Sequence, residues 1–148
     1  MYHKIMVPLD GSDLAEYAIP PARALAVAFK ASLHLTTVEE IPEQPAASEW
    51  DLTLGDFLDK KRQLIQERLD KLANPLRSEG LEVTTSILPL GPPVARLLEE
   101  LQQQKADLIV LHSHGRSGVS RMIWGSVAER LTRQASCPVM IVHAQRTS

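Results

Sequence analysis

Short apolar runs alternate along the chain with longer stretches in which apolar residues recur at helical spacing. Five runs have the length and composition of strands: KIMVPLD, SLHLTTV, LEVTTSIL, DLIVLH and PVMIVHA. The first and fourth are almost continuously apolar, which is typical of strands that are buried on both faces in a parallel sheet. Strands that alternate with helices predict right-handed crossovers and a sheet that is covered by helices on both faces.

The stretches between these runs predict helices that begin near Asp13, Leu54, Gly91 and Gly125. In the first of them, Asp13 and Glu16 stand three residues apart, as in a capping box. Pro20 is expected to kink or divide this helix, because proline lacks a backbone donor and its ring crowds the preceding turn.

An open five-stranded parallel sheet of this kind is a doubly wound α/β fold. Ligands bind to such sheets at the carboxyl ends of the strands, where the winding reverses direction. Two loops, PLDGS and HSHGRSG, follow strands and so lie at this edge. The alternation of elements does not determine the order of the strands, so the position of the reversal stays open at this point.

The composition is that of one ordinary globular domain without a strong charge. The 148 residues are 44% hydrophobic and 23% charged, with a formal net charge of -2. No basic patch stands out, which argues against nucleic-acid binding, and no apolar run approaches the length of a membrane span. The single cysteine, Cys137, cannot form an internal disulfide. We therefore expect a single cytoplasmic domain.

The segment LHSHGRSGVSRMIWGS has the features of an anion site. Gly115 and Gly118 permit a tight path with exposed backbone amides. Gly125 and Ser126 then begin a helix, with Ser126 and Glu129 spaced as in a capping box. A helix start offers unpaired N–H groups and the positive end of the helix dipole, so it suits a phosphate. The segment is neither a Walker A loop nor a G-x-G-x-x-G turn, and a plain surface loop before a well-capped helix is the alternative.

Together these segments resemble the universal stress proteins over the whole chain. KIMVPLDGSDLAEYA is similar to the first strand and turn of that family, and ADLIVLHSHGRSGVSRMIWGSVAERLTRQASCPVMIV is similar to its carboxyl-terminal half. The ATP-binding branch carries the motif G-x2-G-x9-G-[ST], in which Gly115 here is the second glycine and Gly125 and Ser126 close the motif. His112 stands where the first glycine would be. The resemblance implies one nucleotide-binding domain over residues 1–148 and strand order 3-2-1-4-5, with the winding reversed between the first and fourth strands.

The resemblance further implies an adenine-nucleotide site at this reversal. By role, the implied residues are Pro8, Leu9 and Val38 for the adenine pocket, Asp10 for the ribose, and Gly115, Gly125, Ser126 and Val127 for the ribose and phosphates. The cofactor would be ATP, or AMP or ADP, with Mg²⁺ or Mn²⁺ carried by the phosphates. In this family the last strand typically pairs across a two-fold axis, so a homodimer through residues 139–143 is also implied.

Two side chains of the segment leave alternatives open. Arg116 could reach the phosphates, or it could be a solvated loop charge. The His112 ring takes up space that a glycine would leave. If the ring points into the cleft, it narrows the pocket or stacks on a ring of the nucleotide; if it points at a neighbouring helix, binding changes little. A metal ion shared by His112 and His114 is disfavoured, because alternate strand positions point to opposite faces.

We interpret the chain as an ATP-binding regulatory or stress-response module rather than an efficient enzyme. The implied site offers phosphate donors and a ribose acceptor, but no base placed to activate water, since Asp10 is assigned to the ribose. A slow ATPase assisted by Asp10 or His114 is one alternative. The other is an interaction module of the same fold that binds no nucleotide. The sequence identifies no protein partner and no particular stress.

Overall fold

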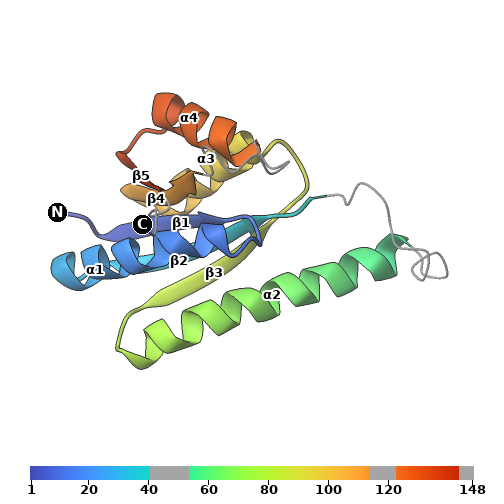
Figure 1. Ribbon diagram of the computed structural model, residues 1–148, viewed down its shortest axis with the longest axis horizontal. Coiled ribbons are helices and arrows are strands. Elements are labelled where there is room, and N and C mark those ends of the chain that lie inside the picture. Colours follow the sequence, from blue (N-terminus) through green and yellow to red (C-terminus); the bar gives the residue numbers. More distant parts are fainter. Residues whose placement is uncertain (41–53, 114–122, 144–148) are drawn as a thin grey trace, which may run out of the picture.

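All five predicted strands are present, and helices alternate with them along the chain (Figure 1). The computed structural model describes residues 1–40, 54–113 and 123–143. The elements in chain order are β1 (Lys4–Leu9), the 3₁₀ helix η1 (Leu14–Ala18), α1 (Ile19–Phe29), β2 (Ser32–Val38), α2 (Leu54–Ser78), β3 (Val83–Leu88), α3 (Pro93–Gln104), β4 (Leu108–Ser113), α4 (Ile123–Gln134) and β5 (Val139–His143).

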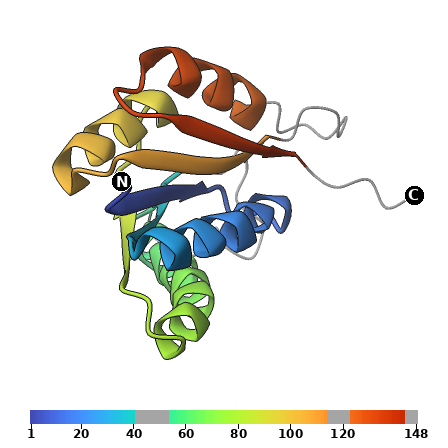
Figure 2. The same cartoon turned by 90° about the vertical axis from the view of Figure 1, so that its left-hand side faces the viewer.

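The sheet is parallel throughout and has the strand order β3-β2-β1-β4-β5. β1 is therefore the central strand. From β1 the chain adds β2 and β3 on one side, and α3 then carries it across to β4 and β5 on the other side (Figures 1 and 2). The winding reverses between β1 and β4, so the implied order 3-2-1-4-5 and the doubly wound α/β fold are confirmed.

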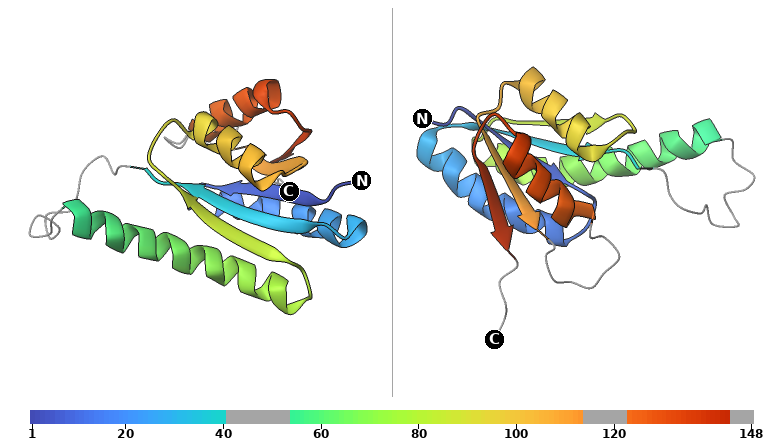
Figure 3. Two further views of the ribbon diagram at one scale, coloured as in Figure 1. Left: turned by 180° about the vertical axis from the view of Figure 1, so that it is seen from behind. Right: turned by 90° about the horizontal axis from the view of Figure 1, so that it is seen from above.

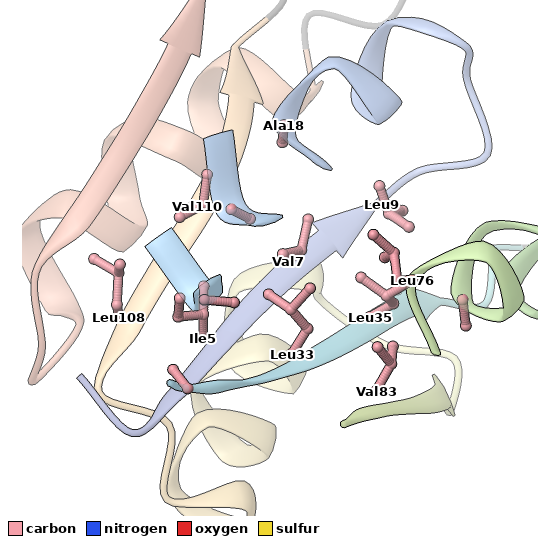
Figure 4. Packing of buried hydrophobic residues seen from close by; sticks show 14 of the residues in the cluster. Ile5, Val7, Leu9, Ala18, Leu33, Leu35, Leu76, Val83, Leu108 and Val110 are labelled. Carbon is pink, nitrogen blue, oxygen red and sulfur yellow. The ribbon is translucent and has the colours of Figure 1, made fainter. Parts of the chain in front are cut away.

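Two apolar layers hold the helices on the two faces of the sheet (Figure 3). One layer contains Ile5, Val7 and Leu9 of β1, packed together with side chains of α1 and α2 (Figure 4). The other contains Met6 and Ile109, packed with side chains of α3 and α4. The central strand is thus buried on both faces, as its unbroken apolar run predicts, and each such side chain stabilises the fold by about 1.5–3 kcal/mol.

The first predicted helix is divided, as Pro20 indicates. η1 precedes α1, and Pro20 lies in the first turn of α1. N–H groups in a first turn have no partner within the helix, so a proline there breaks no helical hydrogen bond. The capping box predicted at Asp13 and Glu16 is wrong, because the Asp13 side chain makes no capping hydrogen bond. Both carboxylates instead bind Arg68 of α2, with 2.8 Å between Arg68 Nη2 and Asp13 Oδ1.

The last helix starts earlier than predicted. α4 begins at Ile123, so Ser126 lies within the helix rather than ahead of it. Glu129 Oε1 accepts a hydrogen bond from Arg133 Nη2 at 2.7 Å. The predicted capping box of Ser126 and Glu129 is therefore wrong, since a capping residue has to precede the first helical turn.

α2 is the long amphipathic helix that the sequence predicts. It spans 25 residues and buries Leu69, Ala73 and Leu76 in the same layer as β1. Its remaining face carries most of its charged residues. In the part of the chain that the structure describes, no helix combines the length and the apolar character needed to cross a membrane.

Candidate functional site

Three strands bring predicted site residues to one edge of the sheet. In a parallel sheet the carboxyl ends of all strands lie at the same edge. Pro8 and Leu9 end β1, Val38 ends β2, and His112 is the penultimate residue of β4. These four residues are buried, whereas Asp10, directly after β1, is half-buried. The sheet therefore brings together the ends of the strands whose residues were predicted for the adenine and the ribose.

The turn after β1 fixes the Asp10 carboxylate. Asp10 Oδ1 accepts hydrogen bonds from Ser12 N at 2.9 Å and from Ser12 Oγ at 2.5 Å. Ser12 Oγ in turn accepts a hydrogen bond from Ala15 N at 3.2 Å, which joins the turn to η1. Gly11 has a φ of 85°, a left-handed conformation that glycine adopts without strain. A half-buried carboxylate held in one orientation can accept hydrogen bonds from the hydroxyl groups of a ligand.

β1 and β4 separate toward this edge. The described residues pair the two strands at two positions only, Ile5 with Leu108 and Met6 with Ile109. The pairing of β1 with β2, by contrast, continues along the whole of β1. The backbone ladder between β1 and β4 therefore stops before the carboxyl ends, as expected for the ligand crevice of a doubly wound sheet.

The His112 ring faces η1 rather than α4. The residue is 3% exposed, and the ring centroid lies 5.9 Å from that of Tyr17, with 37° between the ring planes. Leu108 and Val110 alternate with His112 along β4 and belong to the layer beneath α1 and α2. Of the two orientations considered from the sequence, the structure shows the one in which the ring packs against a neighbouring helical segment.

We expect His112→Ala to lower the free energy of unfolding by roughly 1–3 kcal/mol while changing the affinity for nucleotide little. The ring fills space beneath η1, and alanine would leave part of that space empty. Chemical denaturation measures the first effect, and calorimetric titration with ATP measures the second. His3→Ala, at an exposed position, is the control. A large loss of ATP affinity in a folded His112→Ala protein would make the imidazole a ligand contact instead.

The start of α4 supplies the phosphate side of the predicted site. Gly125 is half-buried, Ser126 is exposed, and Val127 is 3% exposed. Because α4 begins at Ile123, the Gly125 N–H lies in the first turn, where N–H groups have no partner within the helix and the helix dipole places partial positive charge. The backbone N–H groups of Ser126 and Val127 come later and can pair within the helix. Gly115 and Arg116, the other residues predicted for the phosphates, lie outside the described residues.

A side chain at position 125 would meet open space among the described residues. A Cβ atom built on Gly125 has no heavy atom within 4 Å, and the backbone there is not left-handed. Glycine in a helix costs about 0.5–1 kcal/mol relative to alanine. Packing against the described residues does not require glycine at this position, and neither does the backbone conformation. Close approach of a ligand to the backbone would give the glycine a role.

Two groups of ion pairs at this edge are not predictable from the sequence. The alternating charges of α2 indicate only a solvated face. In the structure, Arg62 binds Glu39 directly after β2, and Arg68 binds Asp13 and Glu16 after β1. Glu39 is 8% exposed. The two arginines connect α2 to the segments that follow β1 and β2 at the candidate site. Their partners are 23 and 52 residues away in the chain, and no local sequence pattern indicates pairs at such separations.

The edge as a whole combines buried apolar strand ends, one oriented carboxylate and a helix amino terminus. These groups can hold an apolar ring, hydroxyl groups and an anion, respectively. Within the described ranges, no group of three or more His, Cys, Asp or Glu residues is arranged to hold a metal ion.

A model of the universal stress protein family matches residues 1–143 of the chain. Universal stress protein MJ0531 of Methanocaldococcus jannaschii is 34% identical over 145 residues, which cover 96% of this chain and 82% of that protein.

Solved structures show the same fold. Universal stress protein UspA from Lactobacillus plantarum superposes with a TM-score of 0.76 at 24% identity, covering 95% of this chain and 97% of that one. A universal stress protein in complex with cAMP superposes with a TM-score of 0.68 at 26% identity, covering 97% of this chain and 98% of that one.

Proposed function

The chain belongs to the universal stress protein family, and we propose that it is a regulatory module that binds an adenine nucleotide at the carboxyl ends of β1 and β4. One observation carries the proposal: the oriented Asp10 carboxylate stands at the sheet edge where the winding reverses between β1 and β4. The cAMP complex of a relative with the same fold supports a nucleotide as the ligand class.

Each part of the nucleotide has a counterpart at this edge. The adenine would lie against the buried strand ends, at Pro8, Leu9 and Val38. The Asp10 carboxylate would accept hydrogen bonds from the ribose hydroxyls. Phosphate oxygens would accept hydrogen bonds from the Gly125 N–H in the first turn of α4 and from the Ser126 hydroxyl, with Gly115, Arg116 and Val127 as further proposed contacts.

Regulation rather than efficient catalysis is the role we propose. Two carboxylates at this edge already have partners: Asp10 accepts from Ser12, and Glu39 is bound by Arg62. A general base has to reach the proton that it removes, and neither group is set aside for an attacking water. A Mg²⁺ or Mn²⁺ ion would be carried by the phosphates of ATP or ADP.

Calorimetric titration with ATP, ADP, AMP and cAMP, with and without Mg²⁺, tests the proposal. We expect saturable binding of at least one of them at one site per chain. Mass spectrometry of the small molecules released on denaturation identifies a nucleotide that is carried through purification. If none of the four binds and none is released, the chain is an interaction module. Phosphate released from ATP by the wild type, and lost in a folded Gly125 variant, would indicate a slow ATPase.

Asp10→Asn should weaken nucleotide binding roughly tenfold, because a charged acceptor for the ribose is replaced by a neutral one. The asparagine oxygen can still accept from Ser12, so the turn after β1 should persist. Asp13→Asn is the matched control, since Asp13 lies in the same turn and its side chain is 99% exposed. Equal affinities of Asp10→Asn and the control would remove the carboxylate from the site.

We also propose that the chain forms a homodimer through β5. β5 is an outer strand of the sheet, and its sequence is mainly apolar. Met140 on this strand is 39% exposed. An uncovered apolar edge strand favours pairing with another strand, and β5 of a second copy would pair with its free backbone edge.

A further inference from the structure

A cluster of polar side chains lies between α3 and the β2–β3 half of the sheet, with its histidine and its carboxylate buried and its β3 hydroxyl groups exposed or half-buried. It consists of His34 and Thr36 of β2, Thr84 and Ser86 of β3, and Glu100 of α3, and we call it the α3 polar cluster. His34 is 1% exposed and Glu100 is 5% exposed. None of the five residues belongs to the proposed nucleotide site.

The hydrogen bonds of the cluster fit a neutral His34 beside an ionised Glu100. His34 Nδ1 lies 2.7 Å from Thr84 Oγ1, and His34 Nε2 lies 3.0 Å from both Glu100 Oε2 and Ser86 Oγ. The Ser86 hydroxyl donates to Glu100 Oε2, and Thr36 Oγ1 lies 2.8 Å from Ser86 Oγ. All contacts are satisfied if Glu100 is ionised and His34 is neutral. The ring then donates from Nε2 to the carboxylate and accepts at Nδ1 from Thr84.

Two charged groups face His34 from the elements around it. Glu100 approaches from α3, and Lys4 acts from β1, where its Nζ donates to Gln104 Oε1 at 2.8 Å. β3 contributes the hydroxyl groups of Thr84 and Ser86. A proton on Nδ1 would require the Thr84 hydroxyl hydrogen to turn away from the ring, and it would place a positive charge on a side chain that is only 1% exposed.

The balance of these effects favours the neutral ring. Burial lowers the pKa of His34, and although the Glu100 carboxylate opposes this, the pKa stays below the ordinary value of 6.5. Burial alone would raise the pKa of Glu100, but hydrogen bonds donated by Ser86 and His34 outweigh it and hold that pKa below its ordinary value.

We propose that the α3 polar cluster is an acid-sensitive contact, in which neutral His34 and ionised Glu100 hold α3 on β2 and β3 and protonation of His34 loosens it. The direction of the pH dependence follows from proton linkage. Once α3 opens, His34 binds a proton more readily than it does in the closed protein, so acid favours the open form. The stabilisation of the α3 contact by neutral His34 is therefore complete above the ordinary histidine pKa of 6.5. It falls as the pH drops from 6.5 toward the pKa that His34 has in the closed protein.

Nuclear magnetic resonance of the wild-type chain tests the state of the ring directly. With its imidazole signals assigned through the backbone, His34 should titrate below 6.5. Glu100→Gln should lower that pKa further, because the carboxylate is the group that favours the charged ring. Titration of His34 at or above 6.5, or a higher pKa in Glu100→Gln, would overturn the proposal.

Hydrogen exchange of the α3 amides tests the contact itself. After correction for intrinsic rates, protection in α3 should fall several-fold between about pH 7.5 and about pH 5.5. The loss should disappear in His34→Gln, whose amide can still donate to Glu100, and should persist in the exposed control His3→Gln. His112 is the other buried histidine in the described ranges. If the loss of α3 protection at low pH disappears in His112→Gln but persists in His34→Gln, the assignment to His34 is overturned. An equal loss in α1 would mean global unfolding and would also contradict it.

Discussion

Replacing Gly125 by valine is expected to lower the affinity for ATP roughly 100-fold while leaving the fold intact. The proposed phosphate contacts include the Gly125 N–H at the start of α4, and a branched side chain would stand between it and the phosphate oxygens. Each hydrogen bond to a charged group contributes about 1.5–3 kcal/mol, and a 100-fold loss of affinity corresponds to about 2.7 kcal/mol, so the loss of one strong contact gives this magnitude. The fold should tolerate the change, because a Cβ at position 125 meets no heavy atom of the described residues within 4 Å.

Calorimetric titration gives the affinity, and thermal unfolding without nucleotide shows whether the fold is kept. Gly55→Val is the matched control, since Gly55 is an exposed glycine in the first turn of α2. The two variants should have similar melting temperatures, and only Gly125→Val should lose affinity. An unchanged affinity in the folded Gly125→Val protein would show that the start of α4 does not contact phosphate.

Met140→Asp is expected to convert the proposed homodimer into monomers. Met140 lies on the outer strand β5 with 39% exposure, so a second copy along that edge would cover it. Two-fold symmetry would introduce the carboxylate twice into one interface, where an unpaired buried charge is costly and like charges repel. Ile141 and Val142 are poorer positions for this test, because both pack against the core of their own chain.

Sedimentation velocity reports the mass of the wild type and of the variant over a range of concentrations. Leu64→Asp is the matched control, because it places the same charge on α2 at a side chain with 58% exposure. Circular dichroism confirms that each variant is folded. A Met140→Asp protein that sediments as a dimer, or a wild type that sediments as a monomer, would rule out β5 as the interface.

The alternation of elements was predictable from the sequence, because burial leaves a local periodic signal. The apolar run around Met6 indicates a strand covered on both faces, and both faces of β1 are indeed buried. Pro20 divides the first helix because the effect of proline is also local. The strand order came instead from the family resemblance, since alternation alone is compatible with several orders.

Capping patterns were less reliable guides. The spacing of Asp13 and Glu16 indicates a capping box, but both carboxylates bind Arg68 in the folded chain. Ser126 and Glu129 have the same spacing, but α4 already begins at Ile123. A short polar motif fits many contexts, and a charged partner supplied by a distant helix or a different helix boundary changes its role.

The sequence by itself determined which segments form strands and helices, and which loops lie at the ligand edge of the sheet. Only the tertiary structure decided which side chains meet: His112 packs on Tyr17, Arg62 binds Glu39, and His34 pairs with Glu100. The reason is physical. Periodicity records whether a position is buried, but it does not record the partner, and the last pair lies 66 residues apart in the chain. Strand register and the placement of α3 across the sheet bring those two side chains together.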